Sequence, residues 1–228
     1  MNSYYLRARF FPTIITSIPL LVFVNHVLFV KYALVLKNIF DVLPIIVHLG
    51  LSAAVLFLCV QVNRLIAKEI FQRLYFKEEL FMPTTSHLLY SNRFYETESK
   101  NEIRARIKRS YGIDLLNKDE EKENELKARK LIAGAVSQIR ISLNGNKMLL
   151  QHNIEYGFWR NLIGGSLLAV CFCIAIYFYG LDAHTNDLKL TGIICFIVYL
   201  IPVLLSKLII RSYGKYYAKI LFEQFLSL

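Results

Sequence analysis

The chain has 228 residues, of which 55% are hydrophobic and 19% are charged. It carries 27 lysines and arginines against 17 aspartates and glutamates, a formal net charge of +10. With a mean hydropathy of +0.41, this composition excludes an ordinary soluble domain and favours helices that lie in lipid.

Four apolar runs are each long enough to cross a bilayer core, which takes about 20 helical residues. Their one charged residue, Lys207, lies near the end of its run. The first run is too long for the apolar part of a signal peptide, so we interpret it as a retained span. The sequence therefore predicts an all-α, polytopic membrane protein. Its predicted spans are residues 10–30, 43–62, 162–180 and 190–210.

Lysines and arginines are distributed unevenly around these runs. The two loops between paired spans hold Lys31, Lys37 and Lys189, whereas every other flank is basic. Positively charged flanks stay in the cytoplasm, so we expect both termini and the long middle segment there. The predicted organisation is a membrane pair in residues 1–62, a helical basic cytoplasmic domain in 63–161, a second membrane pair in 162–211 and an amphipathic cytoplasmic tail in 212–228.

The first part of the middle segment is predicted to form two helices. One continues from the second span as a stalk, until the breaker at residues 82–85. The next covers residues 97–111, with Ser99 and Glu102 spaced as a capping box and Gly112 placed as its stop.

A third helix is expected to begin at Asn117, where three acidic residues follow and complement the helix dipole. Its apolar stripe has helical spacing and suits packing against another helix or a copy of itself. A turn at residues 144–146 and a helix over 147–159 then lead into the third span. The stripe consists of Ile132, Val136, Ile139 and Leu143.

The sequence carries none of the usual catalytic motifs, such as HExxH, GxSG, a Walker loop or paired intramembrane aspartates. We therefore predict no enzyme activity, no catalytic residue, no bound metal and no cofactor. Gly164, Gly165 and Ser166 have the composition of a nucleophile turn, but at the start of a span such small residues favour close helix packing. The four cysteines, all within predicted spans, are interpreted as small core residues.

Three polar residues in the first two spans stand out, because polar groups in lipid are costly and tend to face a bundle interior or a water path. They are Asn25, His26 and His48. The two histidines lie at similar depths, counted from the outer ends of their spans. They could form an interhelical hydrogen bond, or they could line a pore repeated by oligomer symmetry.

Basic residues of the middle segment form two groups beyond the span ends. Three interpretations stay open: attraction to anionic lipid headgroups, ion pairs with the acidic run 119–125, or a site for a nucleotide or single-stranded nucleic acid, in which aromatic rings stack on bases. The candidate ligand-binding residues are Arg104, Arg106, Lys108, Arg109 and Tyr111 in the first group and Lys127, Arg129, Lys130 and Arg140 in the second. The tail from Ser212 is amphipathic, and it could lie along the inner leaflet or join subunits.

Four bare spans around a compact, helical, basic domain resemble the small transmembrane effectors of bacterial antiphage systems of the CBASS or Hailong type. The resemblance is one of layout along the whole chain. It implies a homo-oligomer in the bacterial inner membrane that stays closed under the control of a nucleotide, nucleic acid or partner, then disrupts the membrane during infection.

These patterns lead to two functional hypotheses. The first is a non-enzymatic oligomeric pore or channel, gated by differential binding of a ligand or partner to its basic domain. The second is a membrane scaffold that recruits a soluble partner enzyme and conducts nothing. A small transporter is disfavoured, because the spans hold no acidic coupling group.

Overall fold

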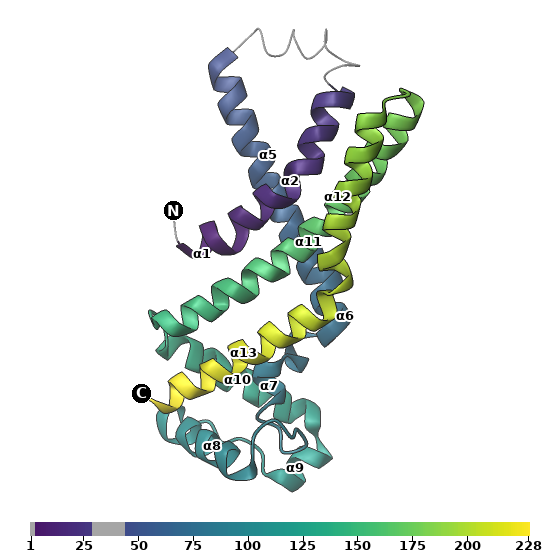
Figure 1. The fold of residues 1–228 in the computed structure, drawn as a ribbon. Coiled ribbons are helices and arrows are strands. Elements are labelled where there is room, and N and C mark those ends of the chain that lie inside the picture. The colour runs from purple at the N-terminus through teal and green to yellow at the C-terminus, as the bar shows by residue number, and fades with distance from the viewer. Residues whose placement is uncertain (1–2, 29–43) are drawn as a thin grey trace. The chain divides into compact units, whose positions relative to one another are not determined.

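A computed structural model describes the backbone of residues 3–28 and 44–228, and the side chains of 3–26 and 53–228. Over these ranges the chain consists of helices and turns without a strand, which confirms the all-α prediction (Figure 1). Three of the described helices are long and apolar enough to cross a membrane: Ser3–His26, Lys147–Asp182 and Asn186–Leu204. They cover most of the first, third and fourth predicted spans, and by their length and composition they indicate a membrane protein.

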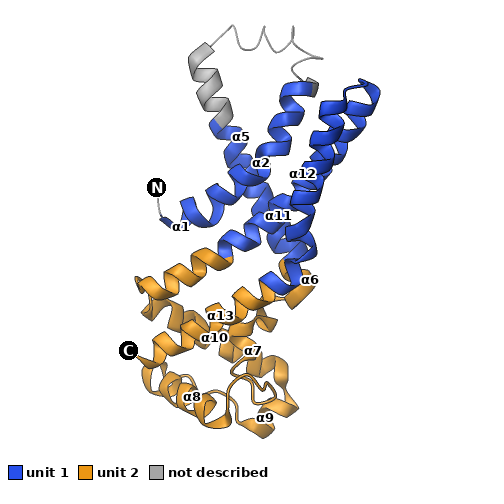
Figure 2. Cartoon of the chain, in the orientation of Figure 1, with its two compact units in different colours: residues 1–71, 157–209 blue, residues 72–156, 210–228 orange. Residues whose placement is uncertain are grey.

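The helices form two compact units (Figure 2). Unit 1 comprises residues 1–71 and 157–209, and unit 2 comprises residues 72–156 and 210–228. Unit 1 contains α1 (Ser3–Tyr5), η1 (Leu6–Phe10), α2 (Phe11–Phe23), η2 (Val24–Leu28), α5 (Pro44–Ile66), α12 (Asn186–Leu204) and most of η3 (Ala67–Gln72) and α11 (Lys147–Asp182). Unit 2 contains α6 (Arg73–Phe76), η4 (Glu79–Phe81), α7 (Pro83–Ser86), α8 (Thr97–Tyr111), α9 (Lys118–Glu123), α10 (Glu125–Ser142), the first turns of α11 and most of α13 (Ser206–Leu226).

In unit 1, α2 and α11 run in the same direction. An ideal Cβ at Gly165 would lie 2.3 Å from the Thr16 hydroxyl, so these two positions face each other. Seven residues further along both helices, the rings of Phe23 and Phe172 lie 5.6 Å apart. The pairing therefore advances by the same number of residues on each helix.

The other two long helices of unit 1 run the opposite way. Ala67 of η3 lies beside Gly164, whereas Cys59, two turns earlier on α5, lies at the level of Leu168. On α12, Gly192 packs against Tyr177 of α11. The four helices thus alternate in direction along the chain, and their basic flanks gather at one end of the unit. These flanks carry Arg7, Arg9, Arg64, Lys68 and Arg160.

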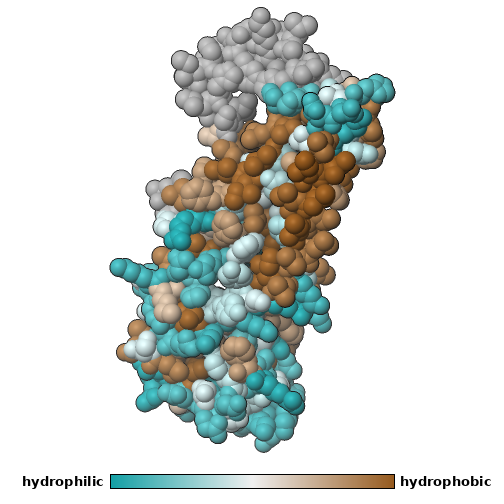
Figure 3. Space-filling view, viewed as in Figure 1, coloured by the Kyte–Doolittle hydropathy of each residue, from teal (hydrophilic) through white to brown (hydrophobic). Residues whose placement is uncertain are grey.

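Apolar side chains cover the outside of unit 1, as expected for helices whose solvent is lipid. The space-filling view shows hydrophobic side chains gathered over these helices (Figure 3). Exposed positions recur at helical spacing, so one face of each helix is apolar. On α12 they include Ile193, Ile194, Ile197, Val198, Ile201 and Leu204, and on α2 they include Ile14, Ile18 and Leu21.

Unit 2 has a hydrophobic core built from α8, α10 and α13. The predicted stripe of α10 is fully or almost fully buried in it, together with Ile103 and Ile107 of α8. The tail joins the same core, because Leu221, Phe222 and Phe225 of α13 are each no more than 1% exposed. This packing differs from the predicted placement along lipid: the apolar face of the tail already has protein neighbours.

Helix boundaries in unit 2 follow local signals, with three differences from prediction. The helix 97–111 and its stop at Gly112, in a left-handed conformation with φ 66°, are confirmed, but its N-cap is Glu96 and no side chain caps it. The stalk ends earlier than expected, at Phe76, because Lys77 adopts φ 58°. The expected third helix is divided into α9 and α10 at Asn124, whose side chain caps α10.

The last predicted span is also shorter than expected. α12 ends at Leu204, and α13 begins at Ser206. Pro202 lies in the last turn of α12, where it has no N–H for the helix ladder. Residues 205–210 therefore lie outside the helix that carries this span.

Candidate functional site

Two prolines in the first membrane-spanning helix each remove a backbone hydrogen bond. A proline has no N–H to donate to the carbonyl four residues before it, so Pro12 and Pro19 release the carbonyls of Ala8 and Ile15. In lipid no bulk water can satisfy such groups, and another part of the protein must do so.

Side chains from two other helices bond to these two carbonyls. Asn161 of α11 donates from Nδ2 to the Ala8 carbonyl over 2.6 Å. The Tyr199 hydroxyl of α12 donates to the Ile15 carbonyl. Asn161 is 1% exposed and Tyr199 is 6% exposed, so both contacts lie inside unit 1. Each proline of α2 is therefore matched by a donor from a neighbouring helix.

A third donor reaches α2 from α5. Asn63 donates from Nδ2 to the Thr16 hydroxyl over 3.0 Å and is 3.3 Å from the Thr13 hydroxyl. Both threonines in turn donate to backbone carbonyls one turn earlier in the same helix. All three side chains are at least 95% buried. We call the contacts of Asn63, Asn161 and Tyr199 with α2 the polar seam.

Small residues allow the helices to approach closely at this seam. An ideal Cβ at Gly164 would lie 2.4 Å from the Asn63 carbonyl oxygen, and one at Gly165 would lie 2.4 Å from Asn63 Nδ2. Ser166 is fully buried beside them. The structure thus places Gly164, Gly165 and Ser166 where α11 meets α2 and α5.

The seam is closed in this structure. The cavity that it borders has a volume of about 10 Å³, enough for about one water molecule. Two buried polar atoms nearby, Asn161 Oδ1 and Ser166 Oγ, have no hydrogen-bond partner in the described part of the chain. The seam therefore joins helices in this state and offers no continuous path.

Of the predicted intramembrane set, the structure describes the side chains of Asn25 and His26, and both lie away from the seam. Asn25 and His26 are exposed at the end of the first helix, and His26 Nδ1 is 3.2 Å from the Val22 carbonyl oxygen. His48 is outside the described side chains, so its pairing with His26 stays a prediction.

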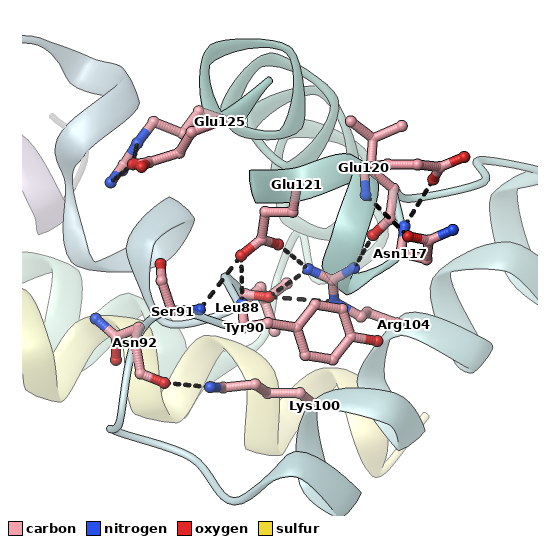
Figure 4. Close-up of polar contacts among 12 residues, drawn as sticks. Leu88, Tyr90, Ser91, Asn92, Lys100, Arg104, Asn117, Glu120, Glu121 and Glu125 are labelled. Atoms are coloured by element: carbon pink, nitrogen blue, oxygen red, sulfur yellow. Dashed lines mark hydrogen bonds and ion pairs between the residues drawn. The ribbon is translucent and has the colours of Figure 1, made fainter. Parts of the chain in front are cut away.

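In unit 2, Arg104 forms a buried ion pair with Glu121 (Figure 4). Its NH2 nitrogen lies 2.9 Å from Glu121 Oε2, and its other donors bond to the carbonyls of Leu88 and Leu116. Glu121 Oε1 accepts the backbone N–H of Tyr90 over 2.6 Å. Of the three interpretations of the basic residues, this pair matches an ion pair with the acidic run 119–125 and not a ligand site, because the Arg104 side chain is only 8% exposed and its nitrogens are bonded within the protein.

Four other members of the predicted set also hold unit 2 together. Arg129 forms an ion pair with Glu125 at 2.6 Å and lies over the Phe81 ring. Arg106 donates to the Leu226 carbonyl of α13 over 2.9 Å. Arg140 lies 3.9 Å from Glu79 and over the Tyr217 ring, and the Tyr111 ring stacks on Phe225.

The remaining predicted cations are more accessible. Lys108 is exposed and forms an ion pair with exposed Asp114 at 2.7 Å. The side chains of Arg109, Lys127 and Lys130 are exposed and have no ion pair or hydrogen bond with another described residue. These four keep the charge that a phosphate group would need.

A pocket of about 280 Å³ adjoins the buried ion pair. It is lined by Tyr90, Ser91, Lys118, Glu121, Lys122 and Glu125. Both glutamates are neutralised within the protein, Glu121 by Arg104 and Glu125 by Arg129. Its two lysines are exposed, and Lys122 is 3.4 Å from exposed Asp119. The pocket therefore offers Lys118, a lysine without an ion pair among the described residues, beside a tyrosine ring, and its volume is close to that of a small-ligand site, about 300 Å³ or more.

The chain matches no protein-family model, no curated protein and no solved structure. The functional assignment therefore depends on the geometry of these two sites.

A buried aromatic group in unit 2 contains a neutral histidine. His87 is 4% exposed, and its ring stacks on Phe94 with centroids 3.8 Å apart. Burial first, and then the charges of Lys215 and Lys100, lower the pKa of His87 to about 4. The histidine is therefore uncharged at neutral pH and packs as a hydrophobic ring.

The sequence patterns did not predict the donors of the seam. Asn63 lies at the start of the predicted stalk, and neither Asn161 nor Tyr199 belongs to a predicted site. The prolines were the available signal: a proline inside a span predicts a released carbonyl four residues earlier, and that carbonyl requires a donor from elsewhere. Their positions alone do not identify which donor.

Proposed function

We propose that this chain is a non-enzymatic, oligomeric effector of the bacterial inner membrane, a pore or channel held closed until its basic cytoplasmic unit responds to a ligand or partner. In the antiphage systems that its layout resembles, opening would disrupt the membrane of an infected cell. The observation that carries the proposal is the polar seam. A helix with two prolines is joined to each of its three neighbours by side-chain hydrogen bonds, which can exchange partners at low cost.

The proposal includes a fourth span and a defined orientation. We assign α5 as this span, since its 23 residues suffice to cross a bilayer core. Because the helices of unit 1 alternate in direction, its basic flanks share one end, and we place that end in the cytoplasm. Both termini and the basic unit then lie on the cytoplasmic side.

Oligomerisation supplies the pathway in this proposal. The seam of one subunit encloses about 10 Å³, far too little for an ion with its water shell. A symmetric assembly would let one helix of each subunit line a shared path, with α2 the helix that rearranges. A ligand would shift the balance between closed and open states only as far as its affinities for the two states differ.

We place the controlling ligand in the pocket that adjoins the Arg104–Glu121 pair. Lys118 and Lys122 supply cations for phosphate oxygens, and the Tyr90 ring offers an aromatic edge to a base. The chemistry suits a nucleotide or the end of an oligonucleotide. The exposed cations Arg109, Lys127 and Lys130 would extend the surface for a longer strand or an acidic partner.

The gating part is tested by dye release from liposomes that contain the purified full-length chain. Asn63→Leu removes the donor from α5 at similar side-chain volume, and about 1.4 kcal/mol of lost closed-state stabilisation would raise release about tenfold. Tyr177→Phe is the matched control, because its ring lies in α11 away from the seam. Release that is equal for wild type, Asn63→Leu and Tyr177→Phe would remove the gating role of the seam.

The ligand part is tested by fluorescence anisotropy with a labelled ten-nucleotide oligothymidine. Reversing Lys118 and Lys122 to glutamate should weaken binding about a hundredfold, because two phosphate contacts are lost. Reversing Lys127 and Lys130 makes the same charge change outside the pocket and should weaken binding less. Equal losses from both pairs would show that general charge attracts the strand and that the pocket does not hold it.

The alternative function is a membrane scaffold for a soluble partner enzyme. The closed seam favours it, because a subunit that never conducts needs no path. Liposomes distinguish the two: a scaffold would release no dye with any variant or with oligothymidine, yet would still recruit a soluble partner to the membrane.

A further inference from the structure

A row of exposed cations runs along α13, directly after the last membrane-spanning helix. Lys207, Arg211, Lys215 and Lys219 recur every four residues, and all four side chains are exposed. A step of four residues turns only about 40° around a helix, so the four form one continuous row along α13. No acidic residue occurs in residues 188–222, so the row is positive along its whole length. We call it the cationic row.

Most of the row is not neutralised within the protein. Lys219 lies 3.6 Å from Glu223, and both side chains are about half exposed. The side chains of Lys207, Arg211 and Lys215 have no ion pair or hydrogen bond with another described residue. Like charges four residues apart on a helix destabilise it, and an anionic partner relieves this repulsion.

The buried residues of α13 follow a parallel row. Ser206, Ile210, Gly214 and Ala218 are buried, and each comes one residue before a cation. Successive residues are about 100° apart around a helix, so the cationic row points away from the buried row at every level. The apolar residues at the end of α13 lie in the core of unit 2. The helix therefore keeps its protein contacts while its cations are accessible to an outside partner.

The position of the row in the chain indicates what this partner is. α12 ends at Leu204, and Lys207 follows within about one turn. Three leucines around this point are exposed to 71%, 47% and 68%: Leu204, Leu205 and Leu208. Exposed leucines gain from contact with hydrocarbon and gain nothing from a phosphate in water, so cations beside them favour a lipid interface over a soluble anionic partner.

We propose that the cationic row binds the anionic lipid headgroups of the leaflet at which α12 ends. The cations contact phosphate oxygens, and Leu205 and Leu208 reach the edge of the hydrocarbon layer. Electrostatic attraction to a bilayer falls off over about 8 Å, and Lys219 lies about 18 Å further along the helix than Lys207, so the whole row is attracted only if α13 follows the surface. The proposal is independent of the gating function, because it requires only that α12 crosses a bilayer.

The test places a fluorescent reporter at the far end of the row. The chain has one tryptophan, Trp159, so Trp159→Phe with Lys219→Trp gives a single reporter and keeps the three unpaired cations. The full-length variant is reconstituted in vesicles of phosphatidylcholine, with or without about one third phosphatidylglycerol. Both kinds of vesicle contain the same small fraction of 5-doxyl-phosphatidylcholine, whose nitroxide quenches tryptophan close to the headgroups.

We expect stronger quenching in the vesicles that contain phosphatidylglycerol. Potassium chloride at about 0.5 M shortens the Debye length to about 4 Å and should remove the difference, because the apolar side of α13 is occupied by unit 2 and only charge holds the row. Equal quenching in the two kinds of vesicle at low salt would overturn the proposal. Quenching that follows the protein-to-lipid ratio and not lipid charge would also overturn it, since a second copy would then cover the row.

Charge variants of the reporter chain separate the row from general charge. Arg211→Gln with Lys215→Gln should weaken binding of α13 to the anionic surface about thirtyfold and abolish the extra quenching. Lys127→Gln with Lys130→Gln removes the same charge from exposed positions of α10 and should change the extra quenching less than about twofold. Equal losses from the two pairs would overturn the proposal. Extra quenching that oligothymidine abolishes would overturn it too, because the row would then prefer a nucleic acid.

Discussion

The pairing of Pro19 with Tyr199 can be tested as a thermodynamic coupling. Tyr199→Phe removes the hydroxyl that donates to the Ile15 carbonyl, the acceptor to which Pro19 has no N–H to donate. In the wild-type background this leaves a buried carbonyl without a donor, and the free energy of unfolding should fall by about 1–2 kcal/mol.

The second background changes the outcome. In Pro19→Ala, the new backbone N–H can donate to the Ile15 carbonyl, so Tyr199→Phe should then cost less than about 0.5 kcal/mol. The coupling energy of the double-mutant cycle should therefore be about 1 kcal/mol. Tyr177→Phe, which removes a hydroxyl elsewhere in unit 1, should show no coupling to Pro19→Ala.

The assay is unfolding of the full-length chain in mixed micelles by increasing sodium dodecyl sulfate, followed by far-ultraviolet circular dichroism. The helical content of each variant in dodecyl maltoside, compared with wild type before sodium dodecyl sulfate is added, checks that the variant folds. If Tyr199→Phe costs the same in both backgrounds, the hydroxyl does not replace the bond that proline removes, and the account of the seam is refuted.

Three further predictions concern packing, the buried ion pair and pH. Gly165→Val should lower the free energy of unfolding by about 3 kcal/mol or more in the same micelle assay, because its Cβ would overlap the side chains of Thr16 and Asn63. Gly134→Ala is the contrasting variant: its Cβ would have no atom within 4 Å, and it should raise the free energy of unfolding by about 0.5–1 kcal/mol. Arg104→Met should lower the free energy of unfolding of unit 2 by about 3–5 kcal/mol, because it leaves the buried Glu121 carboxylate without its partner, and amide hydrogen exchange in unit 2 should become faster. Replacing both residues, as Arg104→Met with Glu121→Leu, should recover part of this loss. Unchanged hydrogen exchange in Arg104→Met would show that the ion pair does not stabilise unit 2. Folding lowers the pKa of His87 from 6.5 to about 4, so the unfolded state binds the proton more tightly. The contribution of the neutral His87 ring to the stability of unit 2 is therefore fully present above pH 6.5, and up to about 3 kcal/mol of stability is lost as pH falls to 4. His87→Phe should remove this dependence of hydrogen exchange on pH, and an unaltered pH profile in that variant would contradict the assignment.

Much of the fold follows from signals that act within a few residues of the chain. Apolar runs of membrane-spanning length predicted the helices at Ser3–His26, Lys147–Asp182 and Asn186–Leu204. Gly112 and Asn117 set a helix end and a helix start because a left-handed stop and a side-chain cap each need only their own neighbours. At Lys77 and Asn124, where the local signals are ambiguous, the helix boundaries in the structure differ from the predicted ones.

The candidate sites depend on contacts between distant residues. Arg104 has the local sequence of an exposed cation in a basic helix, but Glu121, 17 residues away, turns it inward and occupies its donors. The apolar face of the tail fits a lipid surface equally well in sequence, and the core of unit 2 decides that protein covers it.

The sequence by itself determined that this chain is helical and that its helices are long and apolar enough to span a membrane, since hydropathy and caps are properties of short segments. Tertiary structure alone decided which donors complete α2. Asn161 and Ala8 are separated by 153 residues, and Tyr199 and Ile15 by 184. The released carbonyls can be counted from the prolines, but their partners are fixed only when the helices alternate and close around them.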